Sequence, residues 1–424
     1  MRELAIEILG SGMEVGRAAI AVSYDGRKLL LDYGVNFDDN DVPIFPGHVR
    51  PRELDGLVLT HSHLDHIGAA PSLYVSIAPR LIATPLTLDV SKLLLYDMIK
   101  LNGPHLPYDQ STVDDMLHGE HVTSLTYGEQ VEAGEFLVEL VYNGHIPGSA
   151  SALVTVEGHR ILYTSDMNTI PTKLMEPARL SGVKADTVII ESTYGASNHP
   201  PRWETEKAFY ESVCDVVTRG GTVLVPSFSV SRGQEIMAIL AERGCDYPVW
   251  VDGMIRQITD LYLAHGEYLR DPELLSKAAS AFRMVRGWQD RRRAYKKPGV
   301  IIASAGMLKG GPSLYYLKKI AGNPRNAIFL VSYQADGTPG RRIVEEGLYT
   351  DEDLPVKARV QWFDFSSHTD QRGILETLQS IRGVERVILV HGDPEVQKVL
   401  ADKIRERMDV DVLIPESNSR IRIN

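Results

Sequence analysis

The motif HSHLDH, residues 61–66, limits what this chain can fold into more than any other stretch of its sequence. It follows the apolar run LVLT, which predicts a buried β-strand that ends just before His61. In extended backbone the side chains of residues i and i+2 point the same way, so His61 and His63 can bind one metal ion. Asp65 and His66 come next, where a helix is expected to begin, and can face a second ion. We therefore expect a strand, a loop and a helix to meet at a metal site.

Three further candidate ligands also follow predicted strands. His145 comes after FLVELVY, Asp166 ends ILYTSD, and His391 follows the strand in VILVHGD. A single histidine in a loop is more often structural, but these three residues complete two ligand sets when they are combined with HSHLDH. Imidazole nitrogens and carboxylate oxygens suit Zn²⁺, with Mn²⁺ and Fe²⁺ as alternatives.

Composition excludes several classes of protein. The chain has 424 residues, a net charge of −11 and two cysteines, Cys214 and Cys245. Two cysteines provide neither a disulfide framework nor a Cys-rich zinc site. The N-terminus has no signal-peptide core, and no apolar run approaches the ~18 residues of a membrane span. We therefore expect a cytoplasmic protein with no membrane partner, and the negative charge argues against a surface that is basic throughout.

The pattern of predicted elements changes along the chain. In the first part, short strands mix with helices, and two hairpins are predicted to turn at residues 25–26 and 157–158. From Gly195, helices alternate with continuous apolar strands such as TVLVP and AIFLVS, which predicts a parallel sheet covered on both faces. The tail from about Val356 carries the motif SSHTD and the strand RVILVHGD. We expect the middle region to form a separate domain.

One segment departs from the acidic average. Residues 282–297 read FRMVRGWQDRRRAYKK, with seven cations among Phe282, Trp288 and Tyr295. Cations interleaved with aromatic rings suit single-stranded nucleic acid, because its phosphates need positive charge and its bases stack on rings. The alternative is a solvated charged face that offsets the acidic remainder.

The HSHLDH segment matches the HxHxDH motif of the metallo-β-lactamase superfamily, so the chain resembles that superfamily. The resemblance implies a first metal ion held by His61, His63 and His145. It implies a second ion held by Asp65, His66 and His391, with Asp166 bridging the two. Asp32 would support the ligand loops, and the alternative for this residue is an ordinary aspartate at a strand end.

Six further segments are similar to motifs of the β-CASP nucleases, a group within that superfamily. VIIESTYG (188–195), FSSHTD (365–370) and LVHGD (389–393) resemble its motifs A, B and C. PSFSVSRGQE (226–235), ASAGMLKGGPS (303–313) and SYQADGTPGRR (332–342) resemble its inserted domain. The likeness is greatest to the archaeal and bacterial cleavage-and-polyadenylation-specificity-factor-like branch, and we expect no KH domains. Ser367 departs from the pattern, because Gly or Ala is commoner at this position.

The resemblance also implies the fold. Its class is α/β, a metallo-β-lactamase αββα sandwich with an inserted β-CASP α/β domain. We expect residues 1–194 and 345–424 to form the two parts of the sandwich. Residues 195–344 would form the β-CASP cap, with the cleft between cap and sandwich.

The activity that the resemblance implies is that of a zinc-dependent ribonuclease, with two Zn²⁺ per chain and single-stranded RNA as substrate. His368 would act as general acid, oriented by Glu191, and Asp65 would serve catalysis as well as metal binding. The alternatives are a further metal ligand for His368 and a structural carboxylate for Glu191. Ser366 and Arg341 would contact RNA phosphates, and Arg342 with the basic segment would extend that path.

Several rival functions remain open. We favour an endonuclease of RNA processing or decay, and additional 5′→3′ exonuclease activity stays open. A small-molecule metallohydrolase, such as a glyoxalase-like thiolesterase, would lack the insert and would have no use for His368. A non-catalytic RNA-processing scaffold would have lost ligands, and a DNA-processing relative would usually carry valine in place of His391. A homodimer or membership of an RNA-processing complex also stays open.

Overall fold

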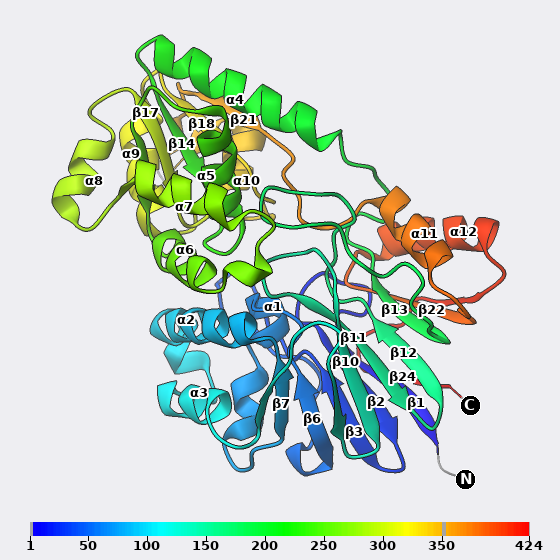
Figure 1. Ribbon diagram of the computed structural model, residues 1–424. Helices are drawn as coiled ribbons and strands as arrows, with labels where there is room; N and C mark the ends of the chain where they lie inside the picture. The colour runs from blue at the N-terminus through cyan, green and yellow to red at the C-terminus, as the bar shows by residue number, and fades with distance from the viewer. Residues whose placement is uncertain (1–2, 350–352, 424) are drawn as a thin grey trace. The chain divides into compact units, whose positions relative to one another are not determined.

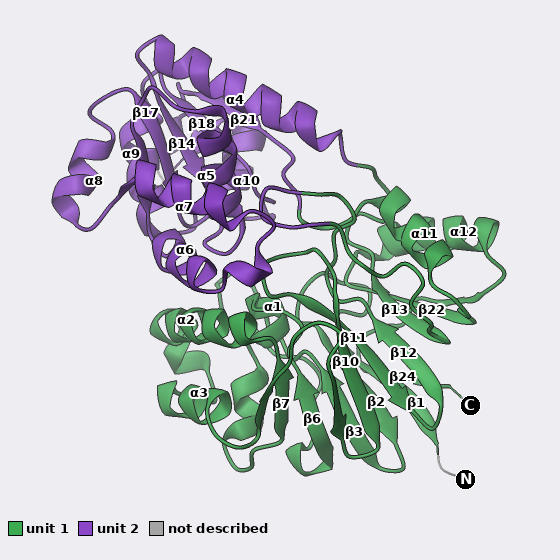
Figure 2. Cartoon of the chain, viewed as in Figure 1, with its two compact units in different colours: residues 1–171, 177–198, 367–424 green, residues 172–176, 199–366 purple. Residues whose placement is uncertain are grey.

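The computed structural model describes residues 3–349 and 353–423, and the chain divides into two units. Unit 1 comprises residues 1–171, 177–198 and 367–424, and unit 2 comprises residues 172–176 and 199–366 (Figure 2). The chain therefore contributes the short stretch 172–176 to unit 2 while it builds unit 1, continues into unit 2 at His199, and returns to unit 1 at Ser367. Each unit combines helices and strands, as the predicted α/β class requires, and each is described by itself.

Unit 1 contains two seven-stranded sheets, labelled in Figure 1. The first has the order β24-β1-β2-β3-β6-β7-β8, and the second has the order β23-β22-β13-β12-β11-β10-β9. Strands of the first sheet are β1 (Leu4–Gly10), β2 (Ala19–Tyr24), β3 (Arg27–Leu31), β6 (Leu54–Val58), β7 (Arg80–Ala83), β8 (Val122–Ser124) and β24 (Ser419–Arg422). Strands of the second are β9 (Gln130–Ala133), β10 (Phe136–Tyr142), β11 (Ala150–Val156), β12 (His159–Tyr163), β13 (Thr187–Glu191), β22 (Arg386–Val390) and β23 (Asp411–Leu413). Each sheet is mixed, because antiparallel pairs continue into parallel ones.

The two predicted hairpins are confirmed. In the turn between β2 and β3, Asp25 and Gly26 have φ of 48° and 80°, and Glu157 and Gly158 between β11 and β12 have φ of 50° and 81°. Two successive residues with positive φ are the mark of the type I′ turn, whose twist matches that of the strands it joins. A glycine at the second position adopts this backbone without strain.

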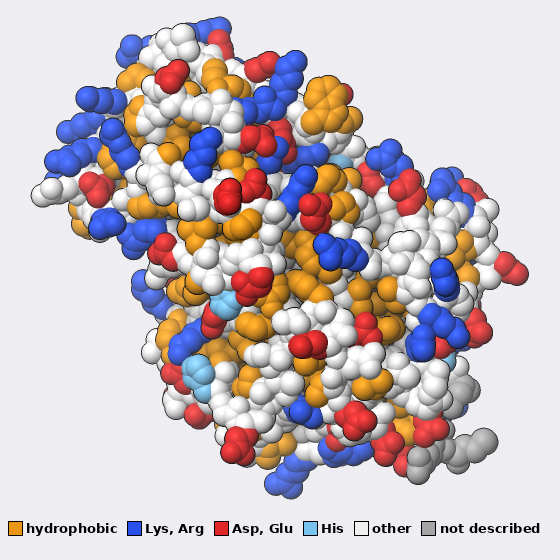
Figure 3. Space-filling model, viewed as in Figure 1, with side chains coloured by type: hydrophobic (Ala, Val, Ile, Leu, Met, Phe, Trp, Pro, Cys, Tyr) orange, Lys and Arg blue, Asp and Glu red, His pale blue; other side chains and the backbone are white. Residues whose placement is uncertain are grey.

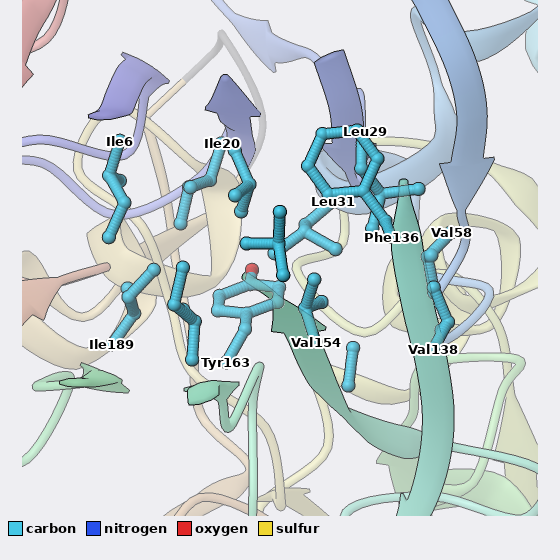
Figure 4. Close-up of a cluster of buried hydrophobic side chains, with 14 of the residues drawn as sticks. Ile6, Ile20, Leu29, Leu31, Val58, Phe136, Val138, Val154, Tyr163 and Ile189 are labelled. Carbon is cyan, nitrogen blue, oxygen red and sulfur yellow. The ribbon is translucent and has the colours of Figure 1, made fainter. Parts of the chain in front are cut away.

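The core of unit 1 lies between the two sheets. Ile6, Ile20 and Leu29 of the first sheet pack against Val154 and Tyr163 of the second, with the other side chains shown in Figure 4. These side chains are almost completely buried. Burying one such side chain stabilises a fold by roughly 1.5–3 kcal/mol, so this layer fixes the alignment of the two sheets.

Helices cover the outer faces of both sheets. On the first sheet, Leu57 and Leu81 share an apolar cluster with residues of α2 (Pro85–Asn102) and α3 (Gln110–Leu117). On the second, Val387 and Leu389 share one with residues of α11 (Gln371–Ser380) and α12 (Pro394–Arg407). The strands are apolar on both faces for this reason. Unit 1 is therefore the predicted αββα sandwich.

Unit 2 is built on one six-stranded parallel sheet with the order β16-β15-β17-β14-β18-β21. Its strands are β14 (Thr222–Pro226), β15 (Val249–Asp252), β16 (Arg283–Met284), β17 (Gly299–Ala303), β18 (Ala327–Leu330) and β21 (Arg359–Trp362). Its helices are α4 (Arg202–Thr218), α5 (Arg232–Arg243), α6 (Ile255–Ala264), α7 (Pro272–Ala281), α8 (Trp288–Ala294), α9 (Gly311–Ile320) and α10 (Pro339–Glu346). The parallel sheet predicted for the middle of the chain is confirmed.

The structure differs from the sequence predictions in two places. Unit 2 extends to Ser366, beyond the predicted boundary at residue 344, because β21 pairs with β18 and so belongs to the parallel sheet. The helix expected after HSHLDH is short: α1 covers Leu64–Ile67, and a 3₁₀ helix follows over Ala70–Tyr74. Pro71 has no backbone N–H to continue an α-helix.

Two short antiparallel strand pairs lie outside the three sheets described above. They are β4 (Asn36–Phe37) with β5 (Pro43–Ile44), and β19 (Leu348–Tyr349) with β20 (Leu354–Pro355).

Candidate metal centre

Seven side chains gather where strands of both sheets of unit 1 end. Four of them follow β6, and the other three follow β10, β12 and β22. They are His61, His63, Asp65, His66, His145, Asp166 and His391. All seven predicted ligands are thus brought together, and the packing of the two sheets positions them.

The first cluster consists of His61, His63, His145 and Asp166, whose candidate ligand atoms all lie within 4.8 Å of one another. Nδ1 of His63 lies 3.1 Å from Nε2 of His61 and 3.3 Å from Nε2 of His145. Oδ2 of Asp166 lies 3.6 and 3.7 Å from the same two Nε2 atoms. Ligand atoms ~2.0–2.2 Å from a tetrahedral zinc ion stand ~3.3–3.6 Å apart, so this spacing fits the ion.

The second cluster consists of Asp65, His66, Asp166 and His391. Nε2 of His66 lies 3.4 Å from Oδ2 of Asp166 and 3.9 Å from Oδ2 of Asp65. His391 lies between the carboxylates, with Nε2 3.4 Å from Oδ2 of Asp65 and Nδ1 3.4 Å from Oδ1 of Asp166. Asp166 belongs to both clusters, so one carboxylate is shared between them.

Asp32 supports the second cluster from behind. Its fully buried carboxylate accepts hydrogen bonds from the backbone N–H of Thr60 at 2.8 Å and from the hydroxyl of Tyr163 at 3.1 Å. It lies 2.7 Å from Nδ1 of His66. Because a carboxylate accepts, Nδ1 of His66 donates to Asp32, and Nε2 is the nitrogen left to face a metal. Asp32 therefore contacts a member of the second cluster and the residue that precedes the HSHLDH motif.

Left-handed backbone turns three site residues away from their strands. Asp32, Ser165 and His391 have φ of 57°, 51° and 52°, and each stands at or close to a strand end. A non-glycine residue in this region costs roughly 1–2 kcal/mol of conformational free energy. Strain of this kind at three points around one cluster is typical of a functional site.

A glycine allows the loop after β3 to pack directly against the HSHLDH segment. A Cβ on Gly34 would lie 1.7 Å from the carbonyl oxygen of Asp65, far inside contact distance. The neighbouring backbone N–H groups of Tyr33 and Val35 donate to the carbonyl oxygens of His66 and Leu64. The loop and α1 are therefore held together backbone to backbone.

Two buried polar atoms test whether the site fits a metal ion. Nε2 of His66 and Oδ1 of Asp166 have no hydrogen-bond partner among the residues that the structure describes. A buried polar atom without a partner costs about 1–3 kcal/mol, which a coordinated cation would remove. Both atoms belong to the second cluster, and the donor set of imidazoles and carboxylates suits zinc. The residues present therefore fit the metal.

The histidines of the first cluster are held neutral. Burial lowers the pKa of His61 and of His145 well below the usual value, and it lowers the pKa of His63 to about 4. The backbone carbonyl of Ser367 lies 2.9 Å from Nδ1 of His145, so that nitrogen donates and Nε2 keeps its lone pair. Neutral imidazoles are the form that binds metal.

The histidines of the second cluster have the opposite shift. Burial would lower the pKa of His66, but Asp166 and Asp32 outweigh it and raise the pKa well above the usual value. The pKa of His391 is raised in the same way, by Asp166 and the hydrogen bond to Asp65 against the effect of burial. Burial would raise the pKa of Asp65, but His391 and His66 lower it. A bound cation would replace the protons that these carboxylates attract.

His368 and Glu191 form a pair beside the second cluster. Nδ1 of His368 lies 2.8 Å from Oε2 of Glu191, and Nε2 points toward Asp166, 3.9 Å from Oδ2. The side chain of Glu191 is 1% exposed and that of His368 is 22% exposed. Burial would lower the pKa of His368, but Glu191 and Asp166 raise it to about 9. The geometry also groups both residues with Asp166 and His391, so a metal-ligand role is to be tested.

Two predicted RNA-contact residues lie outside this unit. Ser366 and Arg341 belong to unit 2, whereas every member of the clusters belongs to unit 1. The guanidinium of Arg341 forms ion pairs with Glu345 at 2.6 Å and Asp336 at 3.6 Å. Its charge is therefore partly neutralised before any RNA arrives.

Sequence reasoning missed the residues that orient Glu191 and the ligands. Oε1 of Glu191 accepts from the backbone N–H of Met167 at 2.7 Å, and Oε2 accepts from the hydroxyl of Thr193 at 2.7 Å. The hydroxyl of Thr193 also lies 3.2 Å from Nδ1 of His391. Thr193 lies two residues after Glu191 in the segment VIIESTYG. This position in the motif is the sequence feature from which its role could have been predicted. In unit 2, His199 and Asp364 form a second close pair, at 2.7 Å.

Comparison with family models accounts for most of the chain. Residues 14–208 match the model described as "Metallo-beta-lactamase superfamily" and residues 234–343 match "Beta-Casp domain". Residues 353–415 match "Zn-dependent metallo-hydrolase RNA specificity domain". The matches follow one another along the chain in the order predicted for sandwich, insert and sandwich.

The chain matches several curated relatives over most of their length. A protein of Saccharolobus solfataricus named "RNase aCSPSF2" is 46% identical, over 99% of this chain and 85% of the relative. "Probable RNase MJ4" of Methanocaldococcus jannaschii is 35% identical, over 98% and 99%. "Transcription termination factor FttA" of Pyrococcus horikoshii is 35% identical, over all of this chain and 71% of the relative.

A solved structure shares the fold. A protein of unknown function from Enterococcus faecalis has a TM-score of 0.61 and 13% identity, and the match covers 99% of this chain and all of that one. At this identity the likeness concerns the fold alone.

No helix among the described residues is both long enough and apolar enough to cross a bilayer.

Proposed function

Because the chain belongs to the β-CASP group of the metallo-β-lactamase superfamily, we propose that it is a zinc-dependent ribonuclease that hydrolyses phosphodiester bonds of single-stranded RNA. The observation that carries the proposal is the pair of clusters that share Asp166, with the His368–Glu191 pair beside them. A site for two cations and a separate proton donor are what hydrolysis of a phosphodiester needs.

The two clusters would hold the metal ions. His61, His63 and His145 would bind the first, Asp65, His66 and His391 the second, and Asp166 would bind both. When bound, two zinc ions supply Lewis acidity, which makes water a nucleophile near neutral pH and stabilises charge on phosphate oxygens. The support for two ions per chain is the number of ligand atoms and the shared carboxylate. Elemental analysis of purified protein tests the count.

His368 would donate the proton that the departing oxygen needs. The carboxylate of Glu191 accepts from Nδ1 of His368, which fixes the ring and keeps it protonated at neutral pH. The remaining N–H at Nε2 points toward Asp166 and hence toward the clusters. When the P–O bond breaks, this proton passes to the leaving oxygen and His368 is left neutral.

The relatives' names support RNA as the substrate class. Two of them are called RNases, and one family model is that of an RNA specificity domain. The chain retains every predicted ligand together with His368, which a thiolesterase would not use and a scaffold would not need. We further propose endonuclease action, a 5′-phosphate on the downstream product and a cytoplasmic location.

One experiment separates these activities. The protein is incubated with a circular RNA and with a linear, 5′-labelled RNA of the same unstructured sequence, with zinc, with manganese and with a chelator. Endonuclease action cuts the circle, and exonuclease action needs the free end. A stable duplex of the same sequence should be spared. Hydrolysis of a glutathione thiolester, with no cleavage of RNA under any metal condition, would overturn the proposal.

A further inference from the structure

The basic segment of unit 2 has no part in the metal centre. Residues 282–297 include α8, and α9 lies against α8 through a contact between Trp288 and Tyr315. Figure 3 shows Lys and Arg side chains gathered over the region that holds α8. In a chain whose net charge is −11, such a concentration of positive charge needs an explanation.

Most cations of this region are exposed, and they outnumber the acids. Asp290 is the one acidic residue of segment 282–297, against seven cations. The neighbouring helix α9 adds Lys318 and Lys319, which are exposed as well. Positive charge that is neither buried nor balanced locally attracts a polyanion.

Aromatic rings lie among these cations, joined through Tyr315. Its ring centroid lies 5.6 Å from that of Trp288 and 6.2 Å from that of Tyr295. The ammonium of Lys319 lies 5.9 Å from the same centroid, and Arg292 is close enough to interact with Tyr315 electrostatically. We call Trp288, Arg292, Tyr295, Tyr315 and Lys319 the Trp288 patch.

The Trp288 ring is held in place but not covered. The guanidinium of Arg291 lies 5.0 Å from the ring centroid and is fixed by two hydrogen bonds to Asp252, at 2.7 and 2.8 Å. The tryptophan nevertheless stays 61% exposed. A fixed exposed ring offers a stacking surface at little entropic cost.

A second exposed tryptophan lies in a different electrostatic setting. Trp203 in α4 is 63% exposed, but the acids of its helix pair with nearby cations, Arg202 with Glu206 and Lys207 with Glu211. That setting offers no excess of positive charge to phosphates. At Trp288 the exposed ring and the unbalanced cations coincide, and this coincidence is what single-stranded nucleic acid requires.

We propose that the Trp288 patch is a second RNA-binding surface, on which a base stacks against Trp288 while Arg292 and Lys319 contact the flanking phosphates. This inference rests on the proposed function for the choice of RNA as the ligand. An RNA long enough to occupy both the patch and the metal centre gains affinity from the patch, and an RNA that fills the metal centre alone does not. The patch therefore sets a preference for longer substrates.

The test measures binding without relying on cleavage. Fluorescence anisotropy of labelled oligouridylates, one of ~30 and one of ~5 nucleotides, compares wild type with Trp288→Ala and with Arg292→Glu/Lys319→Glu. Matched controls are Trp203→Ala for the ring, and Lys398→Glu/Arg407→Glu on α12 for the same change in charge, since both α12 side chains are exposed. Circular dichroism confirms that each variant is folded.

We expect Trp288→Ala to weaken binding of the longer RNA about tenfold, as removal of one stacked base does. The double charge reversal should weaken it further and flatten the dependence of log K on log salt by about 1.4, or about 0.7 for each phosphate that is no longer neutralised. Neither variant should change binding of the short RNA relative to its control. The two controls should resemble wild type.

Each other outcome has a defined meaning. If all variants bind the longer RNA with equal affinity, the proposal that the Trp288 patch binds RNA is wrong, even if the protein proves to be a ribonuclease. The positive charge of the patch would then fit an acidic protein surface as its partner. Weaker binding by the charge variant, with unchanged binding by Trp288→Ala, overturns the stacking surface. Binding through the patch in a protein that never cleaves RNA would instead reject the proposed function and retain the patch.

Discussion

The two clusters of the metal centre use the same kinds of side chain, yet their surroundings treat the histidines in opposite ways. In the first cluster burial dominates, and the pKa of His63 falls to about 4. In the second cluster the pKa of His66 rises well above its usual value, because Asp166 and Asp32 face it. The difference lies in the number of carboxylates: Asp32 and Asp65 flank the second cluster, while Asp166 is shared.

This contrast implies that the two clusters would bind metal differently. The histidines of the first cluster would offer lone pairs that need not lose protons near neutral pH. The second cluster must exchange protons for a cation, and its unpartnered atoms, Nε2 of His66 and Oδ1 of Asp166, gain most from that exchange. We therefore expect a metal ion to remain in the first cluster under conditions that empty the second.

The largest effect should come from removing one ligand of each cluster. We expect His63→Ala and His66→Ala each to lose about one metal ion and to reduce RNA cleavage to background, because the proposed mechanism needs both ions. Elemental analysis and a cleavage assay on the same samples measure this. His105→Ala is the matched control, since His105 is exposed and far from either cluster in sequence. Full activity with trace metal would reject the whole assignment.

Next in size is the effect of His368→Ala, which belongs to neither ligand set. Loss of a general acid lowers the rate by ~10²–10⁴-fold, and the metal content should not change. Glu191→Gln should lower the rate less, because the ring keeps a partner in the amide oxygen. If His368→Ala instead loses metal in proportion to activity, then His368 is a ligand of the second cluster.

A smaller effect is expected from Gly34→Ala, which tests the support of the second cluster. The new Cβ would overlap the carbonyl oxygen of Asp65, so the loop and α1 have to separate. We expect the variant to be destabilised by about 2–4 kcal/mol, as overpacking against rigid backbone is costly. Thermal unfolding monitors stability, and metal analysis should show that the second ion is lost before the first. Equal loss of both ions would contradict this order.

Most of the residues in these predictions could be identified from the sequence, because ligands at strand ends form a recognisable sequence pattern. The spacing of His61, His63, Asp65 and His66 predicted a shared site, and the sandwich that brings it to Asp166 and His391 was implied by the family resemblance. The short α1 and the extension of unit 2 to Ser366 were not predicted, since both depend on tertiary pairing. Opposite pKa shifts in the two clusters depend on which carboxylates face each ring, and that arrangement exists only in the fold.

The pH dependence of metal binding tests the contrast directly. Protons compete with the cation at His66 and His391, because the pKa values of both histidines are raised. The metal affinity of the second cluster should therefore fall as the pH drops below neutrality. For each proton that binding releases, the fall should be about tenfold per pH unit. Protons do not compete in the first cluster until pH nears 4, the pKa of His63. Calorimetric titration in two buffers of different ionisation enthalpy counts the protons released. If metal affinity had the same pH dependence at both clusters, the proposed difference between them would be wrong.

The smallest effect is expected at Ser367, where the sequence departs from its family's pattern. His145 of the first cluster donates from Nδ1 to the backbone carbonyl of Ser367, and every residue carries that carbonyl. We therefore expect Ser367→Ala to retain both metal ions and to change the rate by no more than about twofold, which corresponds to the ±0.5 kcal/mol of a neutral substitution. Steady-state cleavage assays with metal analysis measure this. A loss of the first ion alone would show that the serine hydroxyl holds His145 in place, and the first cluster would then depend on a polar partner as the second does.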